Sequence, residues 1–129
     1  MKWDEEASVF RQKAADDERA MLILIEGKAP VSNIGFCAQQ AIEKNLKSLL
    51  AHRRVAFQRT HDLTLLLDLL SESGLPIPED VAESRLLQLY AVEHRYALLL
   101  QDDPEPLDLN WVQVCVRKTR EWCGVHFGD

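Results

Sequence analysis

The chain has few residues that break regular structure and few that form covalent or metal cross-links. The chain has five glycines and five prolines, and all the prolines with two of the glycines gather at Gly27–Pro30, Gly74–Pro78 and Pro104–Pro106. The three cysteines are an odd number without CxxC or zinc-binding spacing, which favours buried free thiols in a reducing compartment over disulfides. The four histidines are scattered, and neither an HExxH motif nor a glycine-rich phosphate loop occurs. We therefore expect no metal ion and no cofactor.

Long apolar runs and an excess of positive charge are also missing. The longest apolar run, from Met21 to Ile25, is far too short to cross a bilayer, which needs about 20 residues. The opening MKWDEE is acidic, unlike a secretory signal or a transit peptide. We expect a cytoplasmic protein without membrane contact. The net charge of -6 argues against a general polyanion-binding protein, although it leaves room for a local basic patch.

Apolar residues at helical spacing run through the whole chain, which has the length of one domain, residues 1–129. No segment alternates like a β-strand. The spacing predicts five helices: Trp3–Glu26, Ser32 or Asn33 to His52, Thr60–Ser73, Glu79–Leu98 and Asp108–Cys123. Ser32 or Asn33 is expected to cap the second helix, and Thr60 or Asp62 the third. Short connections favour an all-α, antiparallel up-and-down bundle of four long helices and one shorter helix.

Two polar residues interrupt the apolar stripes of the first two helices. Asp17 lies between Ala14 and Met21, and Asn45 lies within the stripe of the second helix. A buried carboxylate needs a cation or several donors, so we expect Asp17 to be substantially buried and bonded to another helix. The candidate partners are Lys44, His61 and Arg95. Structural support is the favoured role for both Asp17 and Asn45.

The second helix also carries a compact polar patch of Gln39, Gln40, Glu43 and Lys44. The simplest interpretation is a solvent-exposed face, on which Glu43 forms an exposed pair with Lys47 at i, i+4 spacing. Gln40 and Lys44 lie one turn apart on the flank of this face. They suit either a ligand or a second subunit.

Two further motifs are candidates for ligand binding. In RTHDL, His61 and Asp62 stand at a helix N-terminus, where backbone N–H groups favour an anion. The alternative for His61 is a capping or core-edge role. In HRY, Arg95 beside Tyr96 at a helix end can bind a phosphate and stack a base. Alternatively, Arg95 pairs with the acidic loop 102–105 while Tyr96 packs.

Arg120 and His126 have the Arg-x4-6-His spacing of a metal-independent ribonuclease motif. Arg54 and His61 have it too. So loose a pattern arises by chance in any chain with many arginines, and it discriminates little.

Three pieces of the chain together resemble one family. They are AADDERAMLILIEG with its inward aspartate, FCAQQAIEKNLKSLL followed by RTHDLTLLLDLL, and EHRYALLL before an acidic, proline-containing loop. These pieces are similar to the HEPN domain (higher eukaryotes and prokaryotes nucleotide-binding), with its QQAxEKxLKxLL and xTHDLxxLL signatures. The resemblance covers nearly the whole chain.

The resemblance implies a small helical bundle, commonly a homodimer, often encoded beside a minimal nucleotidyltransferase. Some members are ribonuclease toxins with an Arg-x4-6-His motif in the dimer cleft, whereas others bind nucleotides or assist the transferase. In toxins the motif commonly begins Arg-Asn and ends His-x-Tyr. Here Arg95 is followed by Tyr96, and positions 100–102 contain no histidine.

The leading hypothesis is a nucleotide-associated HEPN binding module that acts with a minimal nucleotidyltransferase in a toxin–antitoxin-like pair. Its ligand-binding candidates are Gln40, Lys44, His61, Asp62, Arg95 and Tyr96. The first alternative is a ribonuclease toxin that binds and cuts RNA, with Arg120 and His126, or Arg95 and His94, in a dimer cleft. The second is a helical protein-interaction domain without nucleotide binding. We expect a homodimer, with Trp111, Trp122 or the Gln40–Lys44 flank at its interface.

Overall fold

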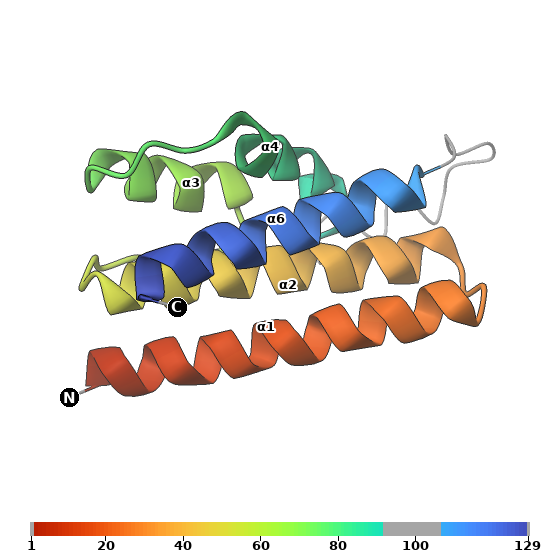
Figure 1. Ribbon diagram of the computed structural model, residues 1–129, viewed down its shortest axis with the longest axis horizontal. Coiled ribbons are helices and arrows are strands. Elements are labelled where there is room, and N and C mark those ends of the chain that lie inside the picture. The colour runs from red at the N-terminus through yellow and green to blue at the C-terminus, as the bar shows by residue number, and fades with distance from the viewer. Residues whose placement is uncertain (1, 92–106, 129) are drawn as a thin grey trace.

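The computed structural model describes residues 2–91 and 107–128, and these residues contain helices and no β-strand (Figure 1). The elements are α1 (Lys2–Glu26), α2 (Val31–His52), α3 (Leu63–Glu72), α4 (Glu79–Ala82), a 3-10 helix η1 (Glu83–Tyr90) and α6 (Leu109–Phe127). The predicted all-α fold class is confirmed. None of the helices in the described ranges is both long and apolar enough to span a membrane.

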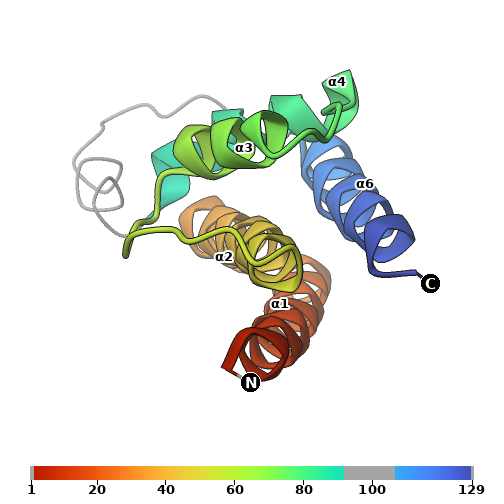
Figure 2. The same cartoon turned by 90° about the vertical axis from the view of Figure 1, so that its left-hand side faces the viewer.

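Helix α2 forms the centre of the molecule. Figure 2 shows it with α1 on one side, α3 on the other and α6 along its flank. Because neighbours surround it, almost every residue from Ala38 onward is buried, and only Lys44 and His52 are partly exposed. The apolar stripe predicted for this helix lies entirely in the core: Ile34, Ala38, Ala41, Ile42, Leu46 and Leu49.

Helices α1 and α2 form an antiparallel hairpin. The Ser48 hydroxyl donates to the Ala7 carbonyl over 2.8 Å, and Lys44 pairs with Asp17 over 2.5 Å. Later residues of α2 therefore meet earlier residues of α1. Helix α2 begins at Val31, directly after Pro30, and no side chain caps it. The expected cap at Ser32 or Asn33 is therefore wrong, because both residues already lie inside the helix.

Helices α2 and α3 run in the same direction, which departs from the predicted up-and-down order. Arg53, just after α2, donates to Ser73, just after α3, whereas His61, just before α3, contacts Glu43 in the middle of α2. The connecting segment 53–62 runs back along α2, so α3 begins beside the middle of α2 and is parallel to it. Asp62 then caps α3 by accepting from the Leu65 N–H, as the sequence predicts.

Helix α6 also runs in the direction of α2. The Cys123 thiol donates to the Asn45 carbonyl, and the Phe127 ring meets the His52 ring edge-on with centroids 5.1 Å apart. Asp108 caps α6, which continues one turn beyond the predicted end at Cys123. Helices α2, α3 and α6 thus run in the same direction, and α1 is antiparallel to them.

The predicted fourth helix, Glu79–Leu98, is wrong within the described residues. The α-helix ends at Ala82, a 3-10 helix follows, and Ala91 has extended backbone dihedrals. A 3-10 helix has three residues per turn, so Ser84, Leu87 and Tyr90 align on its buried face. Leu86 and Leu89, on the other side of the 3-10 helix, are exposed. Residues 92–98 of that prediction lie outside the described part.

All three cysteines are free, as predicted, and two of them are fully buried. Burial raises the pKa of Cys115 and of Cys123 to about 12, although the charge of Arg11 lowers the pKa of Cys123 slightly against this effect. A thiol with so high a pKa stays protonated at neutral pH and is a poor nucleophile. Cys115 and Cys123 are therefore structural residues.

Candidate functional site

The polar patch of α2 is buried, which corrects the expected solvent-exposed face. Glu43 is 2% exposed, Lys47 8% and Gln40 9%, and Gln39 has no exposed surface. The cause is the parallel arrangement of α2 and α3, because the segment that precedes α3 lies over this face. Glu43 and Lys47 therefore form a buried ion pair rather than the exposed pair expected from their spacing.

Glu43 lies at the centre of a hydrogen-bonded cluster. Its carboxylate accepts from Gln39 Nε2 over 3.1 Å, from Lys47 Nζ over 3.0 Å and from His61 Nδ1 over 2.9 Å. A buried carboxylate is costly unless cations and donors compensate it, and here the compensation comes from three side chains on two segments. We call Gln39, Gln40, Glu43, Lys47 and His61 the Glu43 cluster.

The two glutamines complete the Glu43 cluster and fix the position of His61. Gln39 Nε2 also donates to the His61 carbonyl over 3.2 Å, and Gln40 Nε2 donates to Gln39 Oε1 over 2.7 Å. Since the carboxylate of Glu43 accepts from Nδ1, the His61 ring turns Nε2 away from the cluster. The His61 side chain is 45% exposed, so this edge of the ring is available to a ligand.

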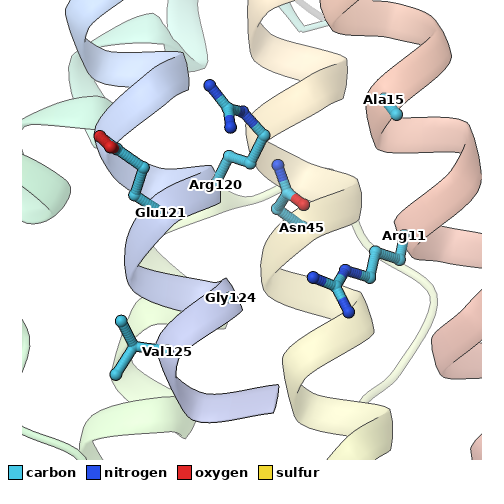
Figure 3. A pocket seen from close by; sticks show the side chains of 7 residues that line it. All are labelled: Arg11, Ala15, Asn45, Arg120, Glu121, Gly124 and Val125. Carbon is cyan, nitrogen blue, oxygen red and sulfur yellow. The ribbon is translucent and has the colours of Figure 1, made fainter. Parts of the chain in front are cut away.

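A second polar feature is a cleft of about 340 Å³ bounded by α1, α2 and α6 (Figure 3). Its lining residues are Arg11, Ala15, Asn45, Arg120, Glu121, Gly124 and Val125. Figure 3 shows Asn45 between the two arginines, with the Glu121 side chain directed to the other side of α6. We call this the three-helix cleft.

Family comparison matches residues 7–123 to the HEPN domain, a range that contains the Glu43 cluster and most of the helices around the cleft. The chain belongs to the HEPN domain family. No curated protein and no solved structure matches it. In the structure, the QQAxEK and THD residues from α2 and from the start of α3 contact one another.

Several predicted site residues of this HEPN domain have local structural roles. Asp17 accepts from Lys44 on α2, the interhelical contact that the sequence predicts, but its side chain remains 25% exposed and is therefore only partly buried. Asp62 caps α3. Gln40 is nearly buried within the Glu43 cluster. Of the ligand-binding candidates described by the structure, His61 is held by a buried carboxylate and has an exposed side chain.

The two nuclease candidates on α6 do not converge within one chain. Arg120 Nε donates to Glu18 Oε1 on α1 over 3.0 Å, whereas the His126 ring lies edge-on against Trp122 with centroids 5.2 Å apart. Their spacing of six positions on a helix with 3.6 residues per turn places them on different sides of it. His94, Arg95 and Tyr96 lie outside the described residues. Among the described ones, no group of three or more metal-ligating side chains has the arrangement of a metal site.

Sequence reasoning missed Arg11 and Lys47 as site residues. Arg11 lies among charged residues on α1, and its position in the cleft depends on how α1 packs against α6. The i, i+4 spacing predicts that Lys47 is an exposed partner of Glu43. One residue of the cleft is visible in the sequence, because Asn45 interrupts an apolar stripe. The structure buries it, with 3% exposure.

Proposed function

We propose that this HEPN domain is a nucleotide-associated binding module and not a ribonuclease. The observation that carries the proposal is the contact between Glu43 and His61. A buried carboxylate fixes the imidazole through Nδ1, and the His61 side chain is 45% exposed. An imidazole held in one orientation loses little freedom on binding, so Nε2 is prepared to accept from a base N–H or a hydroxyl, or to donate to a phosphate oxygen when both ring nitrogens carry a proton.

The positions of the side chains on α6 support the part of the proposal that excludes a ribonuclease. Metal-independent cleavage of RNA requires a general base and a cation close to the same reacting phosphate. Arg120 is paired with Glu18, and His126 packs on Trp122, so the two side chains have different neighbours. A ribonuclease that uses Arg120 and His126 therefore needs a second subunit to bring the two side chains together.

Incubation of the purified protein with RNA in the presence of a metal chelator is expected to leave the RNA intact. Arg120→Ala and His126→Ala should behave like the unmodified protein in this assay, because neither residue is placed for cleavage. Nucleotide binding, measured on the same preparations, should persist in His126→Ala and weaken in His61→Ala. RNA cleavage that disappears in a folded His126→Ala variant would reverse the order of the two functions.

We also propose that the domain is a homodimer and that α6 contributes to its interface. Val125 on this helix is 68% exposed, and both Trp111 and Trp122 are only partly buried. An apolar helix edge with aromatic residues is typical of a subunit interface, and two-fold symmetry is the commonest way to cover one. The partner proposed for this dimer is a minimal nucleotidyltransferase, and co-purification with such an enzyme tests that part.

Light scattering at micromolar concentration is expected to give about twice the 14.8 kDa of one chain. Val125→Glu should shift this mass toward one chain, because a charge in an apolar interface is costly. Val9→Glu on α1 is the matched control, since Val9 is 52% exposed and lies on a different helix. A monomer mass for the unmodified protein would contradict the dimer.

A further inference from the structure

A pocket of about 360 Å³ lies between the first turns of α1 and segment 53–62. Its lining residues are Trp3, Glu6, Phe10, Ala56 and Phe57. Trp3, Glu6 and Phe10 are spaced three and four positions apart, so they share one face of α1. Phe57 meets Phe10 from segment 53–62, with ring centroids 6.1 Å apart and the rings tilted by 54°. We call this the aromatic pocket.

Two of the three rings in the aromatic pocket do not belong to the hydrophobic core. Trp3 and Phe10 are partly buried, and of the three rings Phe57 alone packs against the core. Val55 and Phe57 already attach segment 53–62 to the core, so this attachment does not require Trp3. The pocket has the volume of a small-molecule site, for which roughly 300–1,000 Å³ is usual. Its rings are therefore available to the flat face of a ligand.

The aromatic pocket continues into the Glu43 cluster. Lys47 Nζ lies 6.0 Å from the centroid of the Phe10 ring and donates to Glu43 Oε2 over 3.0 Å. The same carboxylate accepts from His61 Nδ1. Phe57 and His61 are four positions apart on one segment, a stretch that spans at most about 14 Å when fully extended. The pocket and His61 are close enough for one nucleotide to contact both.

The charges along this path differ from one end to the other. Glu6 is the charged residue that lines the pocket, and a carboxylate accepts N–H groups of a base but repels a phosphate. Arg59 lies between Phe57 and His61 in the sequence and is exposed. It forms neither a hydrogen bond nor an ion pair with any residue in the described ranges. The pocket therefore suits a base, and the stretch from Arg59 to His61 suits a phosphate.

We propose that the aromatic pocket binds the base of a nucleotide whose phosphate lies toward Arg59 and His61. This inference rests on the proposed function, because it extends the site at His61 by a second subsite. The base stacks on Trp3 and Phe57, since every base offers a planar π-face to an aromatic ring. Glu6 accepts from an N–H group of the base, and the Arg59 guanidinium donates to phosphate oxygens.

The position and size of the aromatic pocket favour a small ligand over a second copy of the chain. In Figure 2, segment 53–62 lies on the side of α2 opposite to α6, so the pocket is outside the dimer interface proposed for α6. A stable protein interface buries about 800 Å² on each partner, whereas this pocket is formed by five side chains. One ring system with its sugar matches that size better.

The test follows the Trp3 indole N–H signal by NMR in the full-length, isotope-labelled protein. AMP and GMP are the probes, and ribose 5-phosphate is the comparison that lacks a base. We expect a saturable shift of the Trp3 signal with either nucleotide and no shift with ribose 5-phosphate. The indole signals of Trp111 and Trp122 on α6 serve as internal references and should stay in place. An equal Trp3 shift with ribose 5-phosphate would contradict a base in the pocket.

Trp3→Ala should weaken AMP binding by about tenfold or more, because it removes a stacking surface. Val9→Ala is the matched control, since Val9 is on the same helix, is 52% exposed and does not line the pocket. Phe57→Leu tests the same stacking with an apolar side chain that still packs on the core. Circular dichroism verifies that each variant is folded. Unchanged AMP affinity in folded Trp3→Ala and Phe57→Leu would overturn the proposal.

Arg59→Gln should also weaken AMP binding by about tenfold, and it should leave the Trp3 shift at saturation unchanged, because Arg59 contacts the phosphate end. Arg19→Gln is the control, an exposed arginine on α1 outside the pocket. A Trp3 signal that changes with protein concentration alone would identify a second copy in the pocket and overturn the proposal. AMP binding that moves the His61 signals and not Trp3 overturns the aromatic pocket and leaves the proposed function standing. Protein that binds neither nucleotide overturns both.

Discussion

Replacing Glu43 by leucine is expected to lower the free energy of unfolding by about 3–5 kcal/mol, the usual cost of removing one partner of a buried ion pair. Lys47 is 8% exposed and would lose its carboxylate partner. Gln39 and His61 would lose their shared acceptor at the same time. Thermal unfolding followed by circular dichroism should show a melting temperature lower by roughly 10 °C or more.

Two control variants separate the charge effect from a simple loss of packing. Lys47→Met in the Glu43→Leu background should recover much of the lost stability, because it removes the unpaired charge. Glu121→Leu removes a carboxylate that also has an i, i+4 partner, but its side chain is 53% exposed. Its effect should stay within about 0.5 kcal/mol. A Glu43→Leu variant as stable as the original protein would show that the cluster is not buried as described.

Gly35→Ala should reduce the free energy of unfolding by about 1–3 kcal/mol, although alanine normally favours a helix over glycine by about 1 kcal/mol. Gly35 is buried in α2, and an added Cβ would overlap the Tyr90 ring. The ring carbons concerned are close to the Tyr90 backbone, so the whole of η1 would have to shift. Urea denaturation of both proteins measures the difference.

Tyr90→Leu combined with Gly35→Ala should restore part of the loss, since the smaller side chain leaves room for the new methyl group. Gly74→Ala is a useful comparison. Nothing lies within 4 Å of a Cβ at Gly74, but the φ of 103° is unfavourable for alanine. That variant should lose about 1 kcal/mol through backbone strain alone. A Gly35→Ala protein that gains stability would contradict the packing of η1 against α2.

The helices themselves could be predicted because apolar residues at 3.6-residue spacing define a buried stripe, as in α2. Glu43 and Lys47 could not be placed in the same way. An i, i+4 charge pair has the same sequence spacing whether it is exposed to water or buried in a cluster. Whether Glu43 and Lys47 are buried depends on the path of segment 53–62. That path is set by tertiary packing and leaves no local signal.

The 3-10 helix and the cleft show two other limits. Over the eight residues of η1, a period of three and a period of 3.6 differ by little more than one position, so the apolar spacing does not distinguish a 3-10 helix from an α-helix. Arg11 joins the cleft only because α1 packs beside α6. Asn45 was the exception, because a polar residue in an apolar stripe is visible in the sequence.

Equilibrium dialysis of the purified HEPN domain against labelled AMP and ATP is the most direct test of the claim that this domain is a nucleotide-binding module. The account predicts saturable, stoichiometric retention of a nucleotide that falls in His61→Ala and persists in His126→Ala. Circular dichroism of each variant ensures that the proteins compared are folded. Folded protein that retains neither nucleotide would contradict the account.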